Sequence, residues 1–108
     1  MSDSISALQE QLATFAAERQ WEEFHTPKNL AMALTGEVGE LVDVFQWLTP
    51  EESAAIMSSA RREDVTDEVA DVAIYLLRLA DVLGIDLAQA VRDKMARNED
   101  RFPPPEGP

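Results

Sequence analysis

Two pairs of acidic residues occupy matching positions in two separate segments of the chain. Glu37 and Glu40 are three residues apart, and so are Glu68 and Asp71. Apolar residues recur beside each pair at the same intervals, which predicts two helices that share one register and carry their acids along an apolar stripe. If these helices pack stripe to stripe, all four carboxylates meet at one place. The stripes consist of Val38, Leu41, Phe45 and Leu48 in the first segment and of Val69, Val72, Leu76 and Leu79 in the second.

Such a cluster must be neutralised, because two like charges about 5 Å apart repel by roughly 3 kcal/mol at an effective dielectric constant of about 20. Protons would do this through raised pKa values, and divalent cations are the alternative. A site made of carboxylate oxygens suits Mg²⁺, which takes phosphate oxygens as further ligands, and Mn²⁺ is an acceptable substitute. A single Glu-x-x-Glu pair is weak support for a metal site, because solvated helix faces often carry one. A di-iron site needs Glu-x-x-His motifs, and the only histidine, His25, lies in neither helix.

Length and charge narrow the possible functions. The chain has 108 residues and a formal net charge of −12, so we expect a single domain spanning 1–108. This charge repels a phosphate backbone and excludes nucleic-acid binding of the usual basic kind. Cysteine is absent, which excludes thiolate catalysis and cysteine metal sites. No stretch resembles a membrane span or a signal peptide, so we expect no membrane partner and a cytoplasmic location.

The spacing of apolar residues and the capping signals predict an all-α bundle of four to five helices. We expect helices from Ser4 to about Trp21, from 27 to about 47, a short one from 50, one from 62 to 83, and one from 87 to about 100. The proline-rich tail, 103–108, is expected to be frayed. The helix over 62–83 is apolar on more than one face, which predicts an oligomer with helices packed across subunits.

The acidic motif also resembles that of a known family. GEVGE, then 27 residues, then EVAD is similar to the E-x-x-E…E-x-x-D signature of the all-α nucleoside triphosphate pyrophosphatases, the MazG-like superfamily. Further resemblance to its dCTP pyrophosphatase branch lies in FAAERQWEEFHTPKNLAMALTGEVGELVDVFQW, DEVADVAIYLLRLAD and KMARNEDRFP. Gly36, before the first acid, is typical of this branch, whereas Leu12 stands where some relatives that cleave dCTP have a histidine. The preferred base therefore stays open.

The resemblance implies a function and a set of site residues. It implies a dimer or tetramer that binds Mg²⁺ through the four acids and hydrolyses a nucleoside triphosphate, such as dCTP or a modified dCTP, to the monophosphate and pyrophosphate. This is a nucleotide-pool house-cleaning activity. It further implies that the nucleotide pocket is lined by Trp21, Phe24, His25, Trp47 and Tyr75. From the residues alone, Phe24 could instead be a hydrophobic staple and Trp47 a core residue.

Basic residues near the end of the chain are candidates for phosphate contacts. Lys94, Asn98 and Arg101 recur at i, i+4 and i+7 on one side of the last expected helix. An equally good interpretation is a solvated last turn that complements the helix dipole. The resemblance of the closing motif, KMARNEDRFP, to that of the family favours contact of these residues with phosphate, from a neighbouring subunit. Lys28 is a weaker candidate for such a contact.

These observations support a metal-assisted hydrolysis in which one carboxylate, Glu40 or Glu68, receives the proton of the attacking water. Two alternatives differ from it. The chain could be a catalytically silent acidic helical module that binds nucleotides or other partners. It could also be a pyrophosphatase for another nucleotide.

Overall fold

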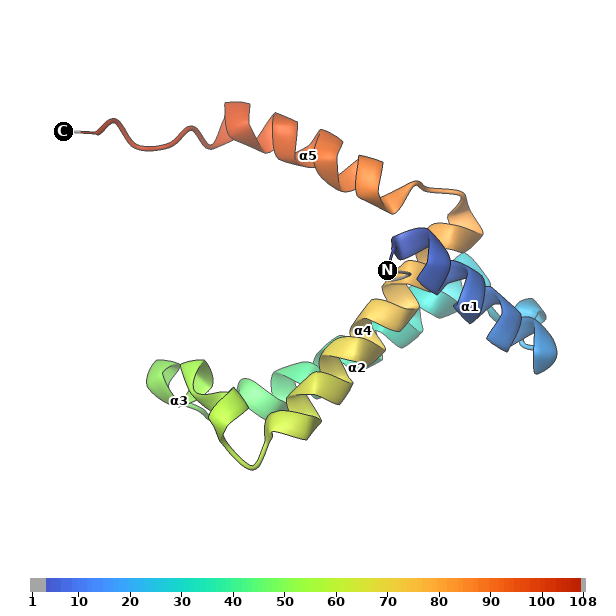
Figure 1. The fold of residues 1–108 in the computed structure, drawn as a ribbon, viewed down its shortest axis with the longest axis horizontal. Helices are drawn as coiled ribbons and strands as arrows, with labels where there is room; N and C mark the ends of the chain where they lie inside the picture. The colour runs from blue at the N-terminus through green and yellow to red at the C-terminus, as the bar shows by residue number, and fades with distance from the viewer. Residues whose placement is uncertain (1–3, 108) are drawn as a thin grey trace.

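The structure, a computed structural model, describes residues 4–107, and every regular element within this range is helical (Figure 1). The all-α prediction is therefore confirmed, and the helix boundaries lie close to those expected. In chain order the elements are α1 (Ile5–Glu18), the short 3-10 helix η1 (Glu22–Phe24), α2 (Pro27–Phe45), α3 (Pro50–Ala54), a second 3-10 helix η2 (Ile56–Ser58), α4 (Arg62–Leu83) and α5 (Leu87–Arg101).

Polar side chains begin four of the five α-helices of the described range at the expected positions. The side chains of Ser4, Thr26, Thr49 and Asp86 each accept a hydrogen bond from the backbone N–H three residues later, at 3.0–3.2 Å. These bonds satisfy N–H groups that have no partner within the helix. Thr49 forms a full capping box, because the Glu52 carboxylate also accepts a bond from the Thr49 N–H at 2.9 Å.

Two helices end earlier than the sequence predicts. α1 ends at Glu18 rather than near Trp21, because Gln20 adopts a left-handed backbone conformation with φ 58°. The Trp21 N–H then bonds the Ala16 carbonyl at 2.9 Å, and the Gln20 N–H bonds the Ala17 carbonyl at 3.1 Å. This is a Schellman ending, which usually uses glycine, as Gly84 does after α4 with φ 70°. α2 likewise ends at Phe45 instead of about residue 47.

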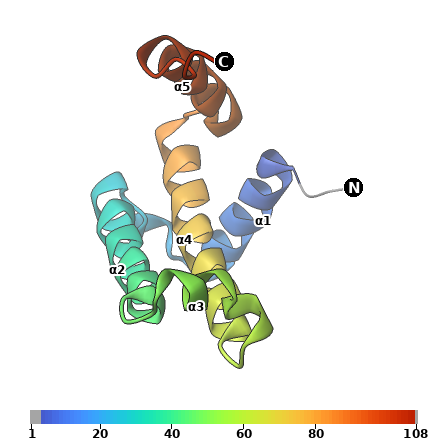
Figure 2. The same ribbon diagram turned by 90° about the vertical axis from the view of Figure 1, so that its left-hand side faces the viewer.

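Helix α4 is the central element, with α2 running along one side of it and α1 along another (Figure 2). A small apolar cluster of Val44, Ile56 and Val65 closes the end of this arrangement where α3 and η2 lie. The two predicted stripes face each other only in part. Leu41 and Val72 are half-buried, but Val38 and Val69 stay 41% and 50% exposed.

Helix α5 projects away from the other helices (Figure 1) and contains no buried residue. Its apolar side chains Val91 and Met95 are 48% and 59% exposed, and Phe102 just after it is 65% exposed. The radius of gyration is 17.2 Å, whereas a compact chain of this length has about 13 Å. Residues 103–107 have no regular secondary structure, and residue 108 of the expected frayed tail lies outside the described range. None of the described helices is long and apolar enough to cross a membrane.

Candidate active site

The four acids meet between α2 and α4. Glu37 and Glu40 come from α2, and Glu68 and Asp71 come from α4, with one carboxylate oxygen of each within 4.8 Å of the others. Each pair is three residues apart on its helix, so both members project from neighbouring turns toward the opposite helix. Glu40 is exposed and the other three are partly buried. The shared register of the two segments therefore predicts this meeting point correctly.

The cluster is electrostatically unfavourable without a counterion. Partial burial raises the pKa of Glu37 above its usual range, and the nearby carboxylates of Glu40, Asp71 and Glu68 raise it further. The pKa of Glu68 is raised for the same reasons, burial first and then the charges of Glu40 and Asp71. Both directions follow from removing water around a negative charge and placing like charges beside it. The site therefore favours either protons or cations.

Two oxygen atoms of the cluster are available to a ligand. Glu37 Oε2 and Glu68 Oε2 have almost no exposed surface and no hydrogen-bond partner in the described chain. Buried carboxylate oxygens without a partner are costly, and a divalent cation would satisfy both at once. The donor set contains only carboxylate oxygens, which matches hard cations such as Mg²⁺ or Mn²⁺. The residues present thus fit a divalent metal ion.

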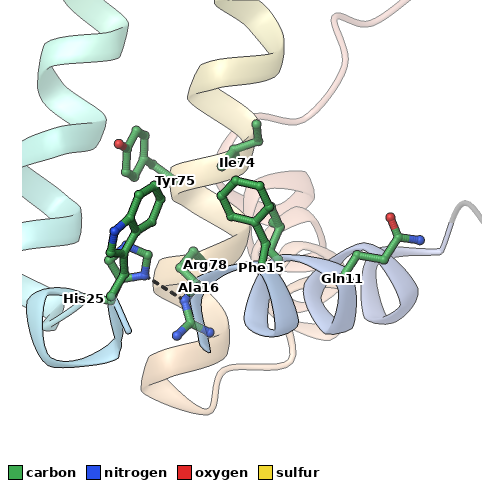
Figure 3. Close-up of a pocket in the computed structure, with 9 residues that line it drawn as sticks. Gln11, Phe15, Ala16, His25, Ile74, Tyr75 and Arg78 are labelled. Carbon is green, nitrogen blue, oxygen red and sulfur yellow. Dashed lines mark hydrogen bonds between the residues drawn. The ribbon is translucent and has the colours of Figure 1, made fainter. Parts of the chain in front are cut away.

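A cavity of about 310 Å³ lies further along α4, between α4, α1 and the segment after α1 (Figure 3). Its position follows from helix spacing, because Tyr75 and Arg78 are four and seven residues beyond Asp71 and share its side of the helix. None of the four acids lines the cavity. The acid cluster and the cavity instead lie next to each other along the same face of α4. The cavity is mostly apolar, and its lining residues are Gln11, Leu12, Phe15, Ala16, Trp21, His25, Ile74, Tyr75 and Arg78.

Aromatic rings line one part of this cavity. The rings of Phe15 and Trp21 meet edge to face with centroids 5.7 Å apart. The ring centroids of Trp21 and His25 are 6.2 Å apart. The left-handed turn at Gln20 brings Trp21 back toward Phe15. Flat rings around an apolar space provide surfaces on which a nucleobase can stack.

The structure brings some of the predicted substrate-facing residues together and leaves others apart. Trp21, His25 and Tyr75 all line the cavity. Phe24, on η1, is 60% exposed, and Trp47, just beyond α2, is 86% exposed, so Trp47 is not a core residue of this chain. Several predicted residues lie outside both the acid cluster and the cavity, namely Phe24, Lys28, Trp47, Lys94, Asn98 and Arg101.

Sequence reasoning did not identify six of the nine lining residues, which are Gln11, Leu12, Phe15, Ala16, Ile74 and Arg78. For Ile74 and Arg78 a signal was available, since they lie three and seven residues after Asp71 and therefore face the same side of α4 as the acid. Phe15 and Gln11 carried no comparable signal. Their positions depend on how α1 crosses α4, which the helix pattern does not determine.

Comparison with known proteins agrees with this geometry. The model of the MazG-like family matches residues 33–107. The chain is 50% identical over 92 residues to dCTP pyrophosphatase 1 of Homo sapiens, and equally to that of Bos taurus, over 84% of this chain and 54% of those proteins. It is also similar to the crystal structure of a pyrophosphatase from Archaeoglobus fulgidus, with a TM-score of 0.85, 41% identity and coverage of 92% of both chains.

The chain spans about half the length of the curated relatives that it matches. The family match nevertheless covers most of the chain, including all four acids, Tyr75 and the whole of α5. The chain therefore belongs to the MazG-like family.

Proposed function

We propose that the protein is a Mg²⁺-dependent nucleoside triphosphate pyrophosphohydrolase that converts dCTP or a modified dCTP to the monophosphate and pyrophosphate, in nucleotide-pool house-cleaning. The observation that carries this proposal is the pair of neighbouring sites on α4. Four acids with two unpartnered buried oxygens lie beside a cavity lined by aromatic rings. The relatives named as dCTP pyrophosphatases support the choice of substrate.

The spacing along α4 suits a nucleotide placed lengthwise. Asp71 and Arg78 are seven residues apart, which corresponds to about 10.5 Å along a helix. This length is comparable with that of a nucleoside monophosphate. With its phosphates at the acid cluster, a nucleotide would place its base in the cavity, between Phe15, Trp21 and Tyr75. A nucleoside triphosphate would thus use both sites at the same time.

Glu37, Glu40, Glu68 and Asp71 would hold the metal ion. When bound, Mg²⁺ would neutralise phosphate oxygens and lower the pKa of a coordinated water. Because α2 and α4 fix the mutual distances of the four carboxylates, these residues would hold the metal ion where the phosphates bound to it are aligned with the attacking water. Glu40 or Glu68 accepts the proton of that water as the oxygen attacks phosphorus. Glu40 is the exposed member, within reach of solvent, whereas Glu68 is partly buried between α2 and α4.

A second copy of the chain completes the site in this proposal. The apolar side chains Val91 and Met95 on α5, and Val69, Ile74 and Leu76 on α4, are left exposed. Exposed apolar surface of this kind often marks a contact between proteins. We therefore propose a homodimer or homotetramer in which α5 of one copy brings Lys94, Asn98 and Arg101 to the phosphates bound by another, with Trp47 also at the contact. A cytoplasmic location stays a prediction.

A nucleotide panel tests the proposed function. The purified protein is incubated with each canonical deoxynucleoside and ribonucleoside triphosphate and with 5-methyl-dCTP, with and without Mg²⁺, and both pyrophosphate and orthophosphate are measured. We expect Mg²⁺-dependent pyrophosphate without orthophosphate, fastest with a cytosine nucleotide. Asp71→Asn should reduce this rate by at least about 100-fold, since even outer-shell partners of metal sites cost 10–100-fold. Glu10→Gln, an exposed acid on α1, is the control and should leave it unchanged.

No pyrophosphate from any nucleotide would contradict the proposal and favour a catalytically silent binding module. Orthophosphate as the first product would place cleavage at a different bond and would also contradict it. A rate unaffected by Asp71→Asn would refute the acid cluster as the active site.

A further inference from the structure

The cavity contains one histidine, and a buried arginine holds it in place. Arg78 of α4 donates a hydrogen bond from its Nε–H to Nδ1 of His25, at 3.1 Å, across 53 positions of sequence. Figure 3 shows this bond at the end of the cavity opposite Ile74 and Tyr75. Arg78 is only 9% exposed, and its other end reaches Asp81 at 3.6 Å. Two partners thus fix the guanidinium.

This bond determines where the imidazole carries its proton. A guanidinium has donors only and no acceptor, so Nδ1 of His25 must be the accepting nitrogen and therefore unprotonated. In a neutral imidazole the proton then resides on Nε2. Because His25 lines the cavity, Nε2–H is the one polar group that this ring can offer to a ligand there.

We propose that Arg78 is a positioning residue that fixes His25 as the Nε2–H tautomer, so that the ring donates a hydrogen bond to an acceptor on the base of the bound nucleotide. This inference rests on the proposed function only for the identity of the ligand. A carbonyl oxygen or an unprotonated ring nitrogen of a pyrimidine provides such an acceptor. The cavity otherwise offers mainly apolar and aromatic surface, so one fixed donor contributes strongly to the choice of base.

The surroundings keep the His25 ring neutral. Burial lowers the pKa of His25 below its usual value of 6.5, and the positive charge of Arg78 lowers it further. The other titratable groups on the surrounding elements are Tyr75 on α4, Asp81, which pairs with Arg78, and Glu22 and Glu23, which precede His25 in the chain. The α1 residues that line the cavity are uncharged. Near neutral pH the ring therefore stays an acceptor toward Arg78 and a donor toward the cavity.

Nuclear magnetic resonance of the untagged chain tests the tautomer directly, because His25 is its only histidine. In protein labelled with ¹⁵N-histidine, we expect an Nδ1 shift typical of an unprotonated nitrogen and an Nε2 shift typical of N–H. Arg78→Met keeps the length of the side chain and removes the donor and the charge. It should produce a mixture of tautomers and raise the pKa of His25. Arg78→Lys, which keeps a donor and the charge, should restore the wild-type shifts.

Kinetics and ligand binding test the role in substrate recognition. Arg78→Met should raise KM for the cytosine nucleotide about tenfold, as expected for one lost hydrogen bond in a dry site, and leave kcat within about twofold. Arg78→Lys should recover most of the KM. Addition of dCTP with a methylene bridge between the α and β phosphates, with Mg²⁺, should shift the Nε2 resonance in the wild type and shift it less in Arg78→Met.

Each result decides a separate point. A protonated Nδ1 in the wild type, or an unchanged tautomer in Arg78→Met, would overturn the proposal even in a fully active enzyme. An unchanged KM with a changed tautomer would reduce Arg78 to a structural role and also overturn it. A protein inactive toward every nucleotide would refute the proposed function. The tautomer and the response of Nε2 to the nucleotide would then still decide the role of Arg78.

Discussion

The α2–α4 pair and α5 differ in what holds their functional side chains in place. Between α2 and α4, packing within one chain brings Glu37 and Glu68 close enough to share a ligand. Helix α5, which carries the candidates Lys94 and Arg101, has no buried residue and projects away from the other helices (Figure 1). Packing within the chain therefore fixes the proposed site residues on α2 and α4, whereas nothing in the described chain fixes those on α5.

This difference teaches that helix pattern and helix placement are separate questions. The period of apolar residues determines which side chains share a face, in α2 and α5 alike. The position of the helix is determined only by the element that packs against that face. For α2 the partner is α4, whereas for α5 nothing in the described chain provides one. The first two predictions below test whether a second copy provides it, and the third tests the acid cluster between α2 and α4.

The largest expected effect comes from disrupting the apolar face of α5. Met95→Glu places a charge on a side chain that is 59% exposed in the isolated chain but buried in the proposed oligomer. We expect dissociation, measured by analytical ultracentrifugation, and a loss of activity of about 100-fold or more. Losing several phosphate contacts accounts for this size, since each charged hydrogen bond contributes about 1.5–3 kcal/mol.

Arg97→Gln is the matched control for this substitution. It changes the net charge by the same amount on a different side of α5, and it should leave both assembly and activity unchanged. A Met95→Glu protein that stays fully active as a monomer would show that α2 and α4 form the complete site without α5.

The next effect separates the two lysines of the chain. Lys94→Ala on α5 should raise KM for the nucleotide about tenfold, because it removes one charge-assisted contact to phosphate. Lys28→Ala in the first turn of α2 should raise it less, since this residue is the weaker candidate. Steady-state kinetics at fixed Mg²⁺ measures both. A larger effect at Lys28 would reverse the assignment and argue against a phosphate contact from α5.

The smallest effect concerns the stability of the α2–α4 pair without metal. The pKa values of Glu37 and Glu68 are raised by folding, so the folded state binds more protons than the unfolded state above the usual glutamate range. Stability in a chelator should therefore be highest near that range and fall as the pH rises through the raised values. Thermal melts measure this, and the shift should be modest because the carboxylates remain partly solvated.

Two additions sharpen this measurement. Mg²⁺ should restore the stability lost at higher pH, and Glu68→Gln should flatten the pH dependence in the chelator, whereas Glu10→Gln on α1 should not. Equal pH dependence in all three proteins would show that the acid cluster does not contribute to it.

Much of the fold could be predicted from the sequence because its signals are local. The caps at Thr26 and Asp86 require only the residues next to them, and each accepts a backbone hydrogen bond where the sequence predicts a helix to begin. The meeting of the four acids was predictable because α2 and α4 share one register. The early end of α1 was not, since a left-handed Gln20 is uncommon and glycine usually marks such a turn.

The parts of the site that the sequence did not reveal depend on contacts between distant segments. The bond from Arg78 to His25 joins positions 53 apart, and no spacing rule connects them. Phe15 lines the cavity because of the angle at which α1 crosses α4. In the proposed oligomer, the place of Lys94 relative to the acids depends on a contact outside the single chain. Periodicity determines faces, but it does not determine tertiary or subunit contacts.

Helix α4 runs without interruption through 22 residues and carries Asp71, Tyr75 and Arg78 on one side. An uninterrupted helix has a fixed rise per residue, so it holds the metal end and the base end of the proposed site at a fixed distance from each other. Inserting one residue between Asp71 and Tyr75 would rotate the two ends by about 100° relative to each other. A larger base would therefore have to be accommodated by widening the cavity from the α1 side, since one extra residue in α4 would break the alignment of Asp71 with Tyr75 and Arg78.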